Sequence, residues 1–179
     1  MTVRLVILGL LREKPLYGYE IKQIIEEHMS DWTSIAFGSI YFALNKLAEE
    51  GFIEKIQVEK QGKRPSREVY QITEAGREEF KRLLREVWKD QERQYYSIDV
   101  GLAFSDALPP EELMGYMQER VRQLEYTLRY LDGHEADEMN REDMPPMAKA
   151  VFEHSRVHYQ AELAWMKDLL QQFENGKTT

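Results

Sequence analysis

Apolar and polar residues at the start of the chain occur in short blocks separated by turn residues. Leucines recur at helical spacing from about Val3 to Arg12, and Pro15 follows them, so this stretch is predicted to form a first helix. A second helix is expected to begin near Tyr17 or Gly18, because isoleucines then recur at positions 21, 24 and 25. The pattern therefore predicts two short helices in the first part of the chain.

A third helix is predicted from about Ser39, a residue type favoured at the N-cap, to Gly51, a type favoured just after a helix. At 100° per residue, its apolar positions 43, 44 and 47 fall within about 60° of Ile40. An aromatic ring beside an amide and an amine on the opposite arc is not typical of a solvated surface, so we interpret this arc as a recognition face. The recognition face consists of Phe42, Asn45, Lys46 and Glu49, flanked by Ser39 and Tyr41.

Two alternating runs after the third helix predict a β-hairpin. Ile56 alternates with Val58 in the first run, and the turn residues QGKRPS follow it. Tyr70 alternates with Ile72 in the second run, and Thr73 is then expected to cap a fourth helix. Apolar positions 80, 83, 84 and 87 of that helix keep the i, i+3, i+4, i+7 pattern. This order of helices and hairpin is the one that a winged helix-turn-helix domain requires.

The second half of the chain has a different pattern, with long helical repeats. After a short helical segment from Ile98 to Phe104, Pro110 suits the first position of a long helix. Apolar residues at 113, 117, 121, 124, 128 and 131 then follow the spacing of a coiled-coil seam. The pair Asp132-Gly133 is expected to end this helix, and Pro145-Pro146 to open the last one.

The last helix carries two apolar stripes, which implies two packing partners. One stripe consists of Phe152, Ser155, Tyr159, Leu163, Met166, Leu170 and Phe173, and the other of Val151, His154, His158, Ala161, Trp165 and Leu169. A single helical pair has too little interior for both stripes, so a second subunit is expected to cover the remainder. The residues expected at the dimer contact are Leu124, Leu128, Phe152, Tyr159, Trp165, Met166 and Leu170.

The composition fits two small domains, which we expect at residues 1–90 and 91–179. The chain has 179 residues, 42% of them apolar, and no cysteine, which excludes disulfides and thiolate metal sites and fits a reducing cytoplasm. The longest apolar run, Leu5 to Leu11, is far too short to span a membrane. The first residues also lack the pattern of a secretion signal, so a cytoplasmic protein with no membrane partner is expected.

Charge is distributed unevenly along the chain. The net charge of −8 comes entirely from residues 91–179, with 9 Lys and Arg against 17 Asp and Glu, because residues 1–90 carry 15 of each sign. Within residues 55–67, Lys55 and four further cations face Glu59 alone. Such an excess on a hairpin could be a solvated tip, but after a recognition helix it indicates phosphate neutralisation. The cations expected to contact phosphate are Lys60, Lys63, Arg64 and Arg67.

Three sequence blocks occur in the order typical of one family. They are LVILGLLREKPLYGYEI, GSIYFALNKLAEEGFI and VYQITEAGREEF, and together they closely resemble the N-terminal domain of PadR-family transcriptional regulators. The resemblance implies a mainly α fold with a small β-hairpin wing, in which a winged helix-turn-helix domain precedes an all-helical C-terminal dimerisation domain. It further implies a homodimer that binds a pseudo-palindromic operator in double-stranded DNA. The long C-terminal region is most similar to the branch of phenolic-acid-responsive repressors.

The resemblance also bears on individual residues of the expected DNA-binding surface. Tyr41 matches a tyrosine that lies on the DNA-reading helix of the family, whereas Phe42 departs from the family pattern and could meet thymine methyl groups. Asn45 could read adenine or contact phosphate. Tyr17-Gly18 could offer free backbone N–H groups to a phosphate, or Gly18 could only permit close packing. The expected DNA-binding set is Tyr17, Gly18, Ser39, Tyr41, Phe42, Asn45, Lys46, Lys60, Lys63, Arg64 and Arg67.

A different class of function remains open from the sequence, namely a winged-helix module that binds protein and not DNA. The neutral first half favours that alternative, and the cationic hairpin opposes it. No carboxylate pair, phosphate-binding glycine loop or nucleophile motif stands out, so neither an enzyme nor a cofactor is expected. His154 and His158 have the spacing of a metal pair, but further ligands are lacking, and interface packing is favoured over a metal.

Aromatic residues are dense where the first half meets the second. The candidates there for binding a small aromatic effector are Trp88, Tyr95 and Phe104, because the resemblance places effectors near the hinge in some relatives. Packing in a hydrophobic core is the alternative for each of these side chains.

Overall fold

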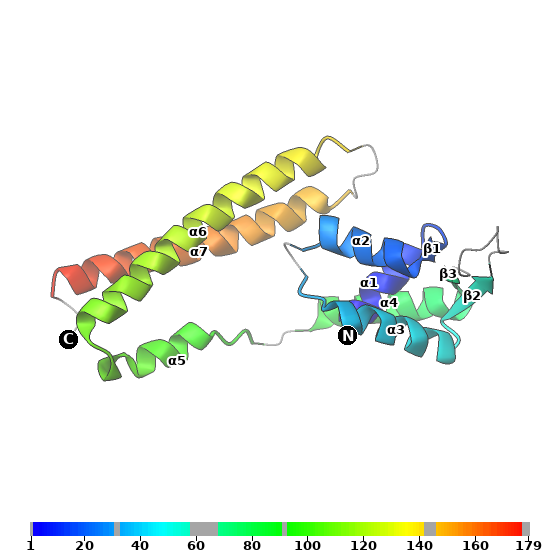
Figure 1. Ribbon diagram of the computed structural model, residues 1–179, viewed down its shortest axis with the longest axis horizontal. Helices are drawn as coiled ribbons and strands as arrows, with labels where there is room; N and C mark the ends of the chain where they lie inside the picture. Colours follow the sequence, from blue (N-terminus) through cyan, green and yellow to red (C-terminus); the bar gives the residue numbers. More distant parts are fainter. Residues whose placement is uncertain (1, 31–32, 58–67, 91–92, 142–145, 177–179) are drawn as a thin grey trace, which may run out of the picture. The chain divides into compact units, whose positions relative to one another are not determined.

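The computed structural model describes residues 2–30, 33–57, 68–90, 93–141 and 146–176, which belong to two compact units (Figure 1). The first unit covers Met1–Glu92 and the second Arg93–Thr179. The elements of the first unit are α1 (Thr2–Leu11), β1 (Leu16–Tyr17), α2 (Gly18–His28), α3 (Phe37–Glu49), β2 (Ile53–Gln57), β3 (Glu68–Ile72) and α4 (Glu74–Lys89). Those of the second unit are α5 (Ser97–Ala103), the short 3₁₀ helix η1 (Ser105–Ala107), α6 (Pro110–Glu138) and α7 (Ala148–Glu174).

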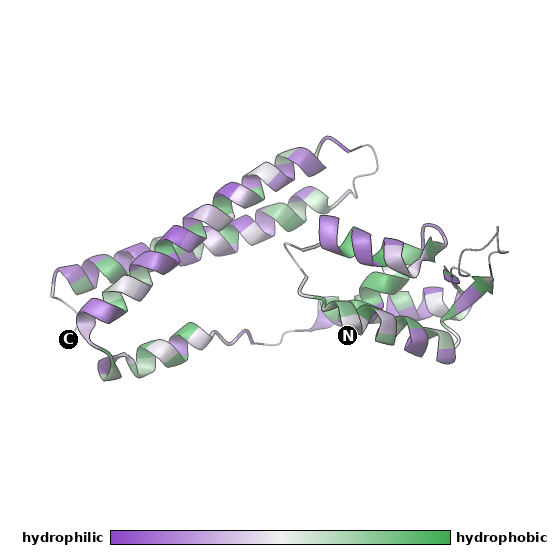
Figure 2. Ribbon diagram, in the orientation of Figure 1, coloured by the Kyte–Doolittle hydropathy of each residue, from purple (hydrophilic) through white to green (hydrophobic). Residues whose placement is uncertain are grey.

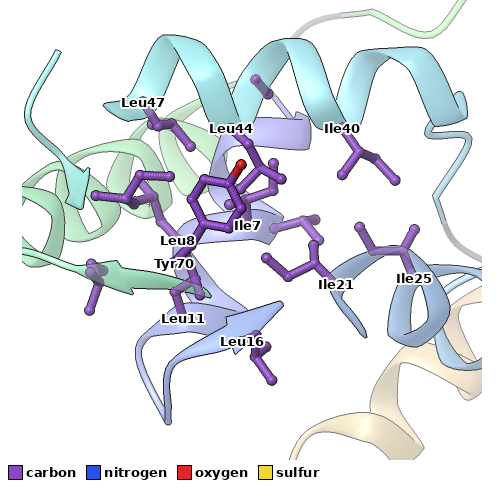
Figure 3. Packing of buried hydrophobic residues seen from close by; sticks show 14 of the residues in the cluster. Ile7, Leu8, Leu11, Leu16, Ile21, Ile25, Ile40, Leu44, Leu47 and Tyr70 are labelled. Carbon is purple, nitrogen blue, oxygen red and sulfur yellow. The ribbon is translucent and has the colours of Figure 1, made fainter. Parts of the chain in front are cut away.

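The core of the first unit forms where the apolar faces of α1, α2 and α3 meet the sheet (Figure 3). Ile7 and Leu8 of α1, Ile21 of α2 and Leu44 of α3 are completely buried. Burial of each such side chain contributes about 1.5–3 kcal/mol, so this core is the main stabilising feature of the unit. The α3 side chains that the periodicity predicted to face inwards lie in this core.

The sheet of the first unit has three antiparallel strands in the order β1-β3-β2. Leu16 of β1 pairs with Tyr70 of β3, and Ile53 of β2 pairs with Ile72 on the other side. The sequence predicted only the hairpin of β2 and β3. A strand of two residues is too short to show an alternating pattern, so β1 had no detectable signal.

The end of α3, the start of β2 and the start of α4 meet at Thr73. Its hydroxyl donates to the carbonyl oxygen of Gly51 at 2.8 Å and accepts from the Gly76 N–H at 3.0 Å, as expected for a cap. The Thr73 N–H also donates to the carbonyl oxygen of Phe52 at 3.0 Å. Gly51 has a φ of +78°, which confirms its predicted place just after the helix. We call the hydrogen-bonded residues Gly51, Phe52, Thr73 and Gly76 the Thr73 joint.

The start of α3 differs from the prediction. The helix begins at Phe37 with Ala36 as its N-cap, so Ser39 lies inside the first turn. The Ser39 hydroxyl donates to the Ala36 carbonyl oxygen at 2.5 Å instead of capping backbone N–H groups. A serine within the first turn satisfies its hydroxyl locally in this way, and the sequence alone does not separate that arrangement from a cap.

In the second unit, α6 and α7 lie side by side (Figure 1). Met117 and Leu124 of α6 pack with Met166 of α7 in a common core, and Leu131 and Phe152 are also buried. Hydrophilic and hydrophobic positions alternate along both helices (Figure 2), as expected for an amphipathic pair. The predicted seam of α6 therefore packs against α7. Pro110 occupies the first turn of α6, as predicted.

The prediction that α6 ends at Asp132-Gly133 was wrong, because the helix continues to Glu138. A glycine inside a helix costs about 1 kcal/mol relative to alanine, and contacts with α7 offset that cost. Arg156 of α7 donates to Asp132 at 3.0 Å and also binds Glu135. The last helix begins at Ala148, shortly after the proline pair that was expected to open it. Within the described part of the chain, no helix has the length and apolar character that crossing a membrane requires.

Candidate nucleic-acid interface

The recognition face lies at the surface of α3. Phe42 is 68% exposed, Tyr41 is 37% exposed, and Asn45 and Lys46 are exposed as well. The opposite side of the helix is fixed by the buried Leu44 and its neighbours in the core (Figure 3). Because one side of α3 is anchored and the other is free, the helix holds its exposed side chains in a defined position. A ligand can bind there without any change in the core.

Two side chains that the sequence analysis did not select lie beside Tyr41. The Phe37 ring packs edge-on against Tyr41, with 5.2 Å between centroids, and the Lys22 amine of α2 lies 4.7 Å from the centre of the Phe37 ring. Phe37 is 53% exposed. It was missed because the helix was expected to begin at Ser39, which would have left Phe37 in the connection before it. Its aromatic neighbour at i+4 was a usable signal.

The start of α2 also lies against the recognition face. Gly18 is buried, and a Cβ atom at that position would lie 3.2 Å from Cε1 of Tyr41. The Glu20 carboxylate accepts a hydrogen bond from the Tyr17 N–H at 2.8 Å. Close packing therefore accounts for Gly18, and a phosphate at this helix end would lie near a carboxylate. The Tyr17 ring stacks on Tyr19 with 5.4 Å between centroids.

Two of the lysines close to the recognition face and the wing are paired with carboxylates. The Lys46 amine lies 3.0 Å from Glu49, one turn along α3. The Lys55 amine of β2 lies 3.0 Å from Glu68 of β3. These pairs reduce the positive charge available to a phosphate in the described part of the first unit. The wing cations Lys60, Lys63, Arg64 and Arg67 lie outside the described residues.

The carboxylate at the base of the wing has a perturbed titration. The hydrogen bond from Lys55, together with one from the Tyr70 hydroxyl at 2.8 Å, holds the pKa of Glu68 below its ordinary value. Burial, followed by the hydrogen bond to Glu68, raises the pKa of Tyr70 above its ordinary value. At neutral pH, Glu68 therefore stays ionised and Tyr70 stays protonated. Lys55 of β2 and Glu68 of β3 thus form an ion pair between the two strands at the base of the wing.

The three candidate effector residues are highly exposed within their own units. Trp88 of α4 and Tyr95 are each 80% exposed, and Phe104 is 69% exposed. The Arg93 guanidinium lies 5.5 Å from the centre of the Tyr95 ring. Exposure of this extent argues against the alternative that these rings pack in the core of either unit.

The histidine pair of α7 makes a contact within itself. Nε2 of His154 and Nε2 of His158 lie 3.2 Å apart, and the rings meet edge to face. Glu162, the next polar residue along this side, accepts a hydrogen bond from Arg120 of α6 at 2.9 Å. Among the residues that the structure describes, no three His, Asp or Glu side chains gather where a metal ion could bind.

The residues expected at a dimer contact fall into two groups. Leu124, Phe152 and Met166 are buried within the α6–α7 pair, and Leu128, Tyr159 and Leu170 are partly buried. Trp165 differs, because it is 39% exposed beside the fully buried Met166. The pair also leaves further large apolar side chains at its surface, which are Tyr116, Tyr126, Tyr130 and Val157. Most of the expected contact residues therefore support the helix pair itself, and Trp165 belongs to its outer surface.

The arrangement in the first unit defines a class of protein. Helices α1, α2 and α3 form the core, α3 presents an exposed polar and aromatic face, and the β2–β3 hairpin follows as a wing. This is the winged helix-turn-helix of DNA-binding regulators.

Comparison with known proteins places the chain within that class. Residues 7–82 match the Transcriptional regulator PadR-like family. A curated relative, the negative transcriptional regulator PadR of Bacillus subtilis (strain 168), is 34% identical over 79 residues, or 44% of this chain. The matching segment spans 43% of that relative's own length. Residues 7–82, which lie within the first unit, are thus similar to the PadR-like family of transcriptional regulators. This family consists of regulators and not of enzymes.

Solved structures extend the similarity of fold to nearly the whole chain. Bacillus subtilis PadR in complex with operator DNA is 22% identical with a TM-score of 0.77, and the match covers 97% of this chain and 99% of that one. The structure of the same protein in complex with p-coumaric acid is 21% identical with a TM-score of 0.74, over 97% and 99% of the two chains. The predicted fold, mainly α with a small wing and a helical C-terminal part, is therefore confirmed.

Proposed function

We propose that this protein is a homodimeric transcription repressor that binds a pseudo-palindromic operator through α3 and the wing. The observation that carries the proposal is the division of α3 into a buried side and an exposed side with aromatic, amide and amine groups. A helix anchored in this way can enter a major groove, while the cations of the hairpin neutralise adjacent phosphates. Action on DNA also implies a place inside the cell.

Repression and control by a small molecule are the finer parts of the proposal. The relative that is 34% identical is described as a negative regulator, which supports repression. The complex of Bacillus subtilis PadR with p-coumaric acid supports a small aromatic effector, and Trp88, Tyr95 and Phe104 are exposed aromatic groups suited to such a ligand. An effector of this kind releases DNA only through a difference in its affinity for the free and the DNA-bound protein.

A dimer is proposed from the surface of the second unit. The helix pair buries one stripe of α7 but leaves Trp165 and Val157 exposed on that helix, with Tyr126 and Tyr130 exposed on α6. Exposed aromatic groups of this kind are typical of surfaces that bind another protein. Two copies would place two recognition helices about one helical turn of DNA, roughly 34–36 Å, or a multiple of it, apart.

A second candidate function is a winged-helix module that binds another protein. The pairing of Lys46 with Glu49 and of Lys55 with Glu68 favours it, because these pairs reduce the positive charge of two lysines near the recognition face and the wing. The four cations of the wing, Lys60, Lys63, Arg64 and Arg67, oppose it.

Binding of duplex DNA at several salt concentrations separates the two functions. We would titrate the full-length protein against labelled DNA from upstream of its own coding region, with a random duplex of equal length as control. If a dimer neutralises about eight phosphates, log affinity should fall with log salt at a slope of about −7. The absence of binding at low salt, or a flat salt response, would refute the DNA-binding proposal. Quenching of tryptophan fluorescence by phenolic acids, measured with and without the DNA, would test whether a small aromatic effector binds and whether DNA changes its affinity.

A further inference from the structure

We propose that Phe42 and Asn45 together recognise adenine–thymine pairs in each half-site, with the Phe42 ring on a thymine methyl group and the Asn45 amide on an adenine. This inference rests on the proposed function, since it assigns the bases that the recognition face reads. It does not depend on repression or on an effector.

Phe42 is the most conspicuous apolar group on the recognition face. Its side chain is 68% exposed, more than either Phe37 or Tyr41 on the same helix. Those two rings pack on each other, whereas among the described residues no ring contact involves Phe42. A ring held in water by a rigid helix gains free energy from any apolar partner, and the thymine methyl is the apolar group that the major groove offers.

Ser39 and Lys46, two other polar residues at the recognition face, have partners within the protein. The Ser39 hydroxyl donates to Ala36, and the Lys46 amine is paired with Glu49. Asn45 is exposed, and its amide forms no side-chain hydrogen bond within the described part of the chain. An asparagine amide can both accept from N6 and donate to N7 of adenine, which is its favoured pairing in the major groove.

The composition of α3 argues against guanine as the main target. The commonest specific contact to guanine comes from arginine or lysine, but α3 contains no arginine, and its one lysine is the paired Lys46. Among Phe42, Asn45, Lys46 and Glu49, the groups without a partner in the described part of the chain are therefore an apolar ring and an amide. Both match the A·T pair, which carries a methyl group on one base and an N6/N7 edge on the other.

The spacing of the two residues permits contact with the same or adjacent base pairs. Phe42 and Asn45 are three positions apart on a helix, which places their Cβ atoms about 5–6 Å from each other. Successive base pairs rise about 3.4 Å along the duplex. The Phe42 ring and the Asn45 amide can thus contact the same base pair or two adjacent base pairs.

Single-atom changes in the DNA test the inference. The bound sequence would first be selected from a random duplex pool with the full-length protein, and each thymine would then be replaced by deoxyuridine, which removes only the methyl group. At the contacted position, the affinity of the wild-type protein should fall about fourfold for each methyl group removed. Replacing the contacted adenine by 7-deazaadenine should weaken binding by about 5- to 150-fold.

Protein variants assign each effect to one residue. Phe42→Ala should bind thymine and deoxyuridine duplexes equally, and Asn45→Ala should bind adenine and 7-deazaadenine duplexes equally. Phe37→Ala removes another exposed ring of the same helix and should keep both sensitivities, which makes it the matched control. All three residues are exposed, so the circular dichroism of the variants should be unchanged.

The outcomes separate this inference from the proposed function. Salt-dependent binding with no deoxyuridine effect at any position, or a selected half-site without an A·T pair, overturns the inference and leaves the DNA-binding function intact. A deoxyuridine effect that persists in Phe42→Ala also overturns it. The absence of all DNA binding would overturn both.

Discussion

Gly18 and Tyr41 connect the start of α2 to the exposed side of α3, since a Cβ atom at Gly18 would lie only 3.2 Å from Cε1 of the Tyr41 ring. The absence of a side chain at Gly18 therefore leaves the space that the Tyr41 ring occupies.

Gly18→Ala should weaken specific DNA binding while changing stability little. The added methyl group must displace the Tyr41 ring by a few tenths of an ångström, whereas the better helix propensity of alanine offsets part of the strain, so the free energy of unfolding should change by less than about 1 kcal/mol. Urea unfolding and fluorescence anisotropy with operator DNA would measure the two effects. In the Tyr41→Ala background the same substitution should cause no further fall in affinity, and additive effects would contradict this account.

Gly76→Ala should destabilise the first unit by about 3 kcal/mol or more, because the structure has no space for the methyl group. Its Cβ atom would lie 2.0 Å from the Phe52 carbonyl oxygen and 2.8 Å from Cγ1 of Ile72. Gly115→Ala is the matched control, since Gly115 lies in α6 with no atom within 4 Å of a Cβ, and it should stabilise by up to about 1 kcal/mol. Equal effects of the two changes in urea unfolding would show that the Thr73 joint is not tightly packed.

Protonation of Glu79 should make the first unit less stable in acid. The hydrogen bond from Arg82 at 2.7 Å, and then the charges of Arg82 and Arg4, lower the pKa of Glu79 from its ordinary value of 4.5. A carboxyl whose pKa is lower in the folded state stabilises the protein above its unfolded pKa, and that contribution is lost as the pH falls through the folded pKa. Glu79→Gln should therefore be less stable at pH 7, and its stability should decline less between pH values of about 5 and 3. The free energy of unfolding would be measured with urea at each pH. If its pH dependence is the same for the wild type and for Glu79→Gln, this account is contradicted.

Trp165 and Met166 should have opposite roles although they are adjacent on α7. Met166 is 1% exposed, so Met166→Ala should cost about 2–5 kcal/mol of stability in the second unit. Trp165 is 39% exposed, and Trp165→Ala should instead weaken dimerisation while preserving helix content. Sedimentation equilibrium would give the dimer dissociation constant. If the Trp165→Ala protein dimerises as tightly as the wild type, Trp165 is not part of the proposed dimer contact.

The wing should contribute affinity without sequence preference. Lys63→Ala and Arg64→Ala should weaken binding to operator and random duplexes by the same factor, because phosphates carry no sequence information. Each change should also reduce the magnitude of the salt slope, by about 1 for each phosphate that the variant no longer neutralises. Lys149→Ala removes the same charge from the start of α7 and should have little effect. A selective decrease in affinity for the operator alone would indicate that these side chains bind bases.

Local patterns were sufficient to predict much of this fold. The buried side of α3 follows from the helical period around Ile40, and Thr73 and Gly51 mark a helix start and a helix end through backbone chemistry that is independent of tertiary contacts. The free amide and the exposed ring of the recognition face were likewise visible in the arc opposite the core. These features could be predicted because each depends on a few neighbouring residues.

The features that sequence reasoning missed depend on partners far along the chain. The continuation of α6 through Gly133 is supported by Arg156 of α7, and no local signal marks that contact. The short β1 exists because it pairs with β3 more than fifty positions later. The ion pair of Lys55 and Glu68 likewise joins residues on two different strands. The positive charge at the base of the wing was therefore overestimated from the sequence.

The Thr73 joint has a consequence for how a signal can reach DNA. Hydrogen bonds at Thr73 connect the end of α3, the start of β2 and the start of α4 to one another. Gly76 packs so closely against Phe52 that no side chain would fit between α4 and the start of β2. We therefore expect α3 and β2 to move together with α4, the last helix of the first unit. Within one copy, the fit of α3 to a half-site is then expected to stay constant. In a dimer, the quantity left to vary is the distance between the two half-sites, so operators whose spacer is lengthened or shortened by one base pair should differ in how strongly an effector releases them.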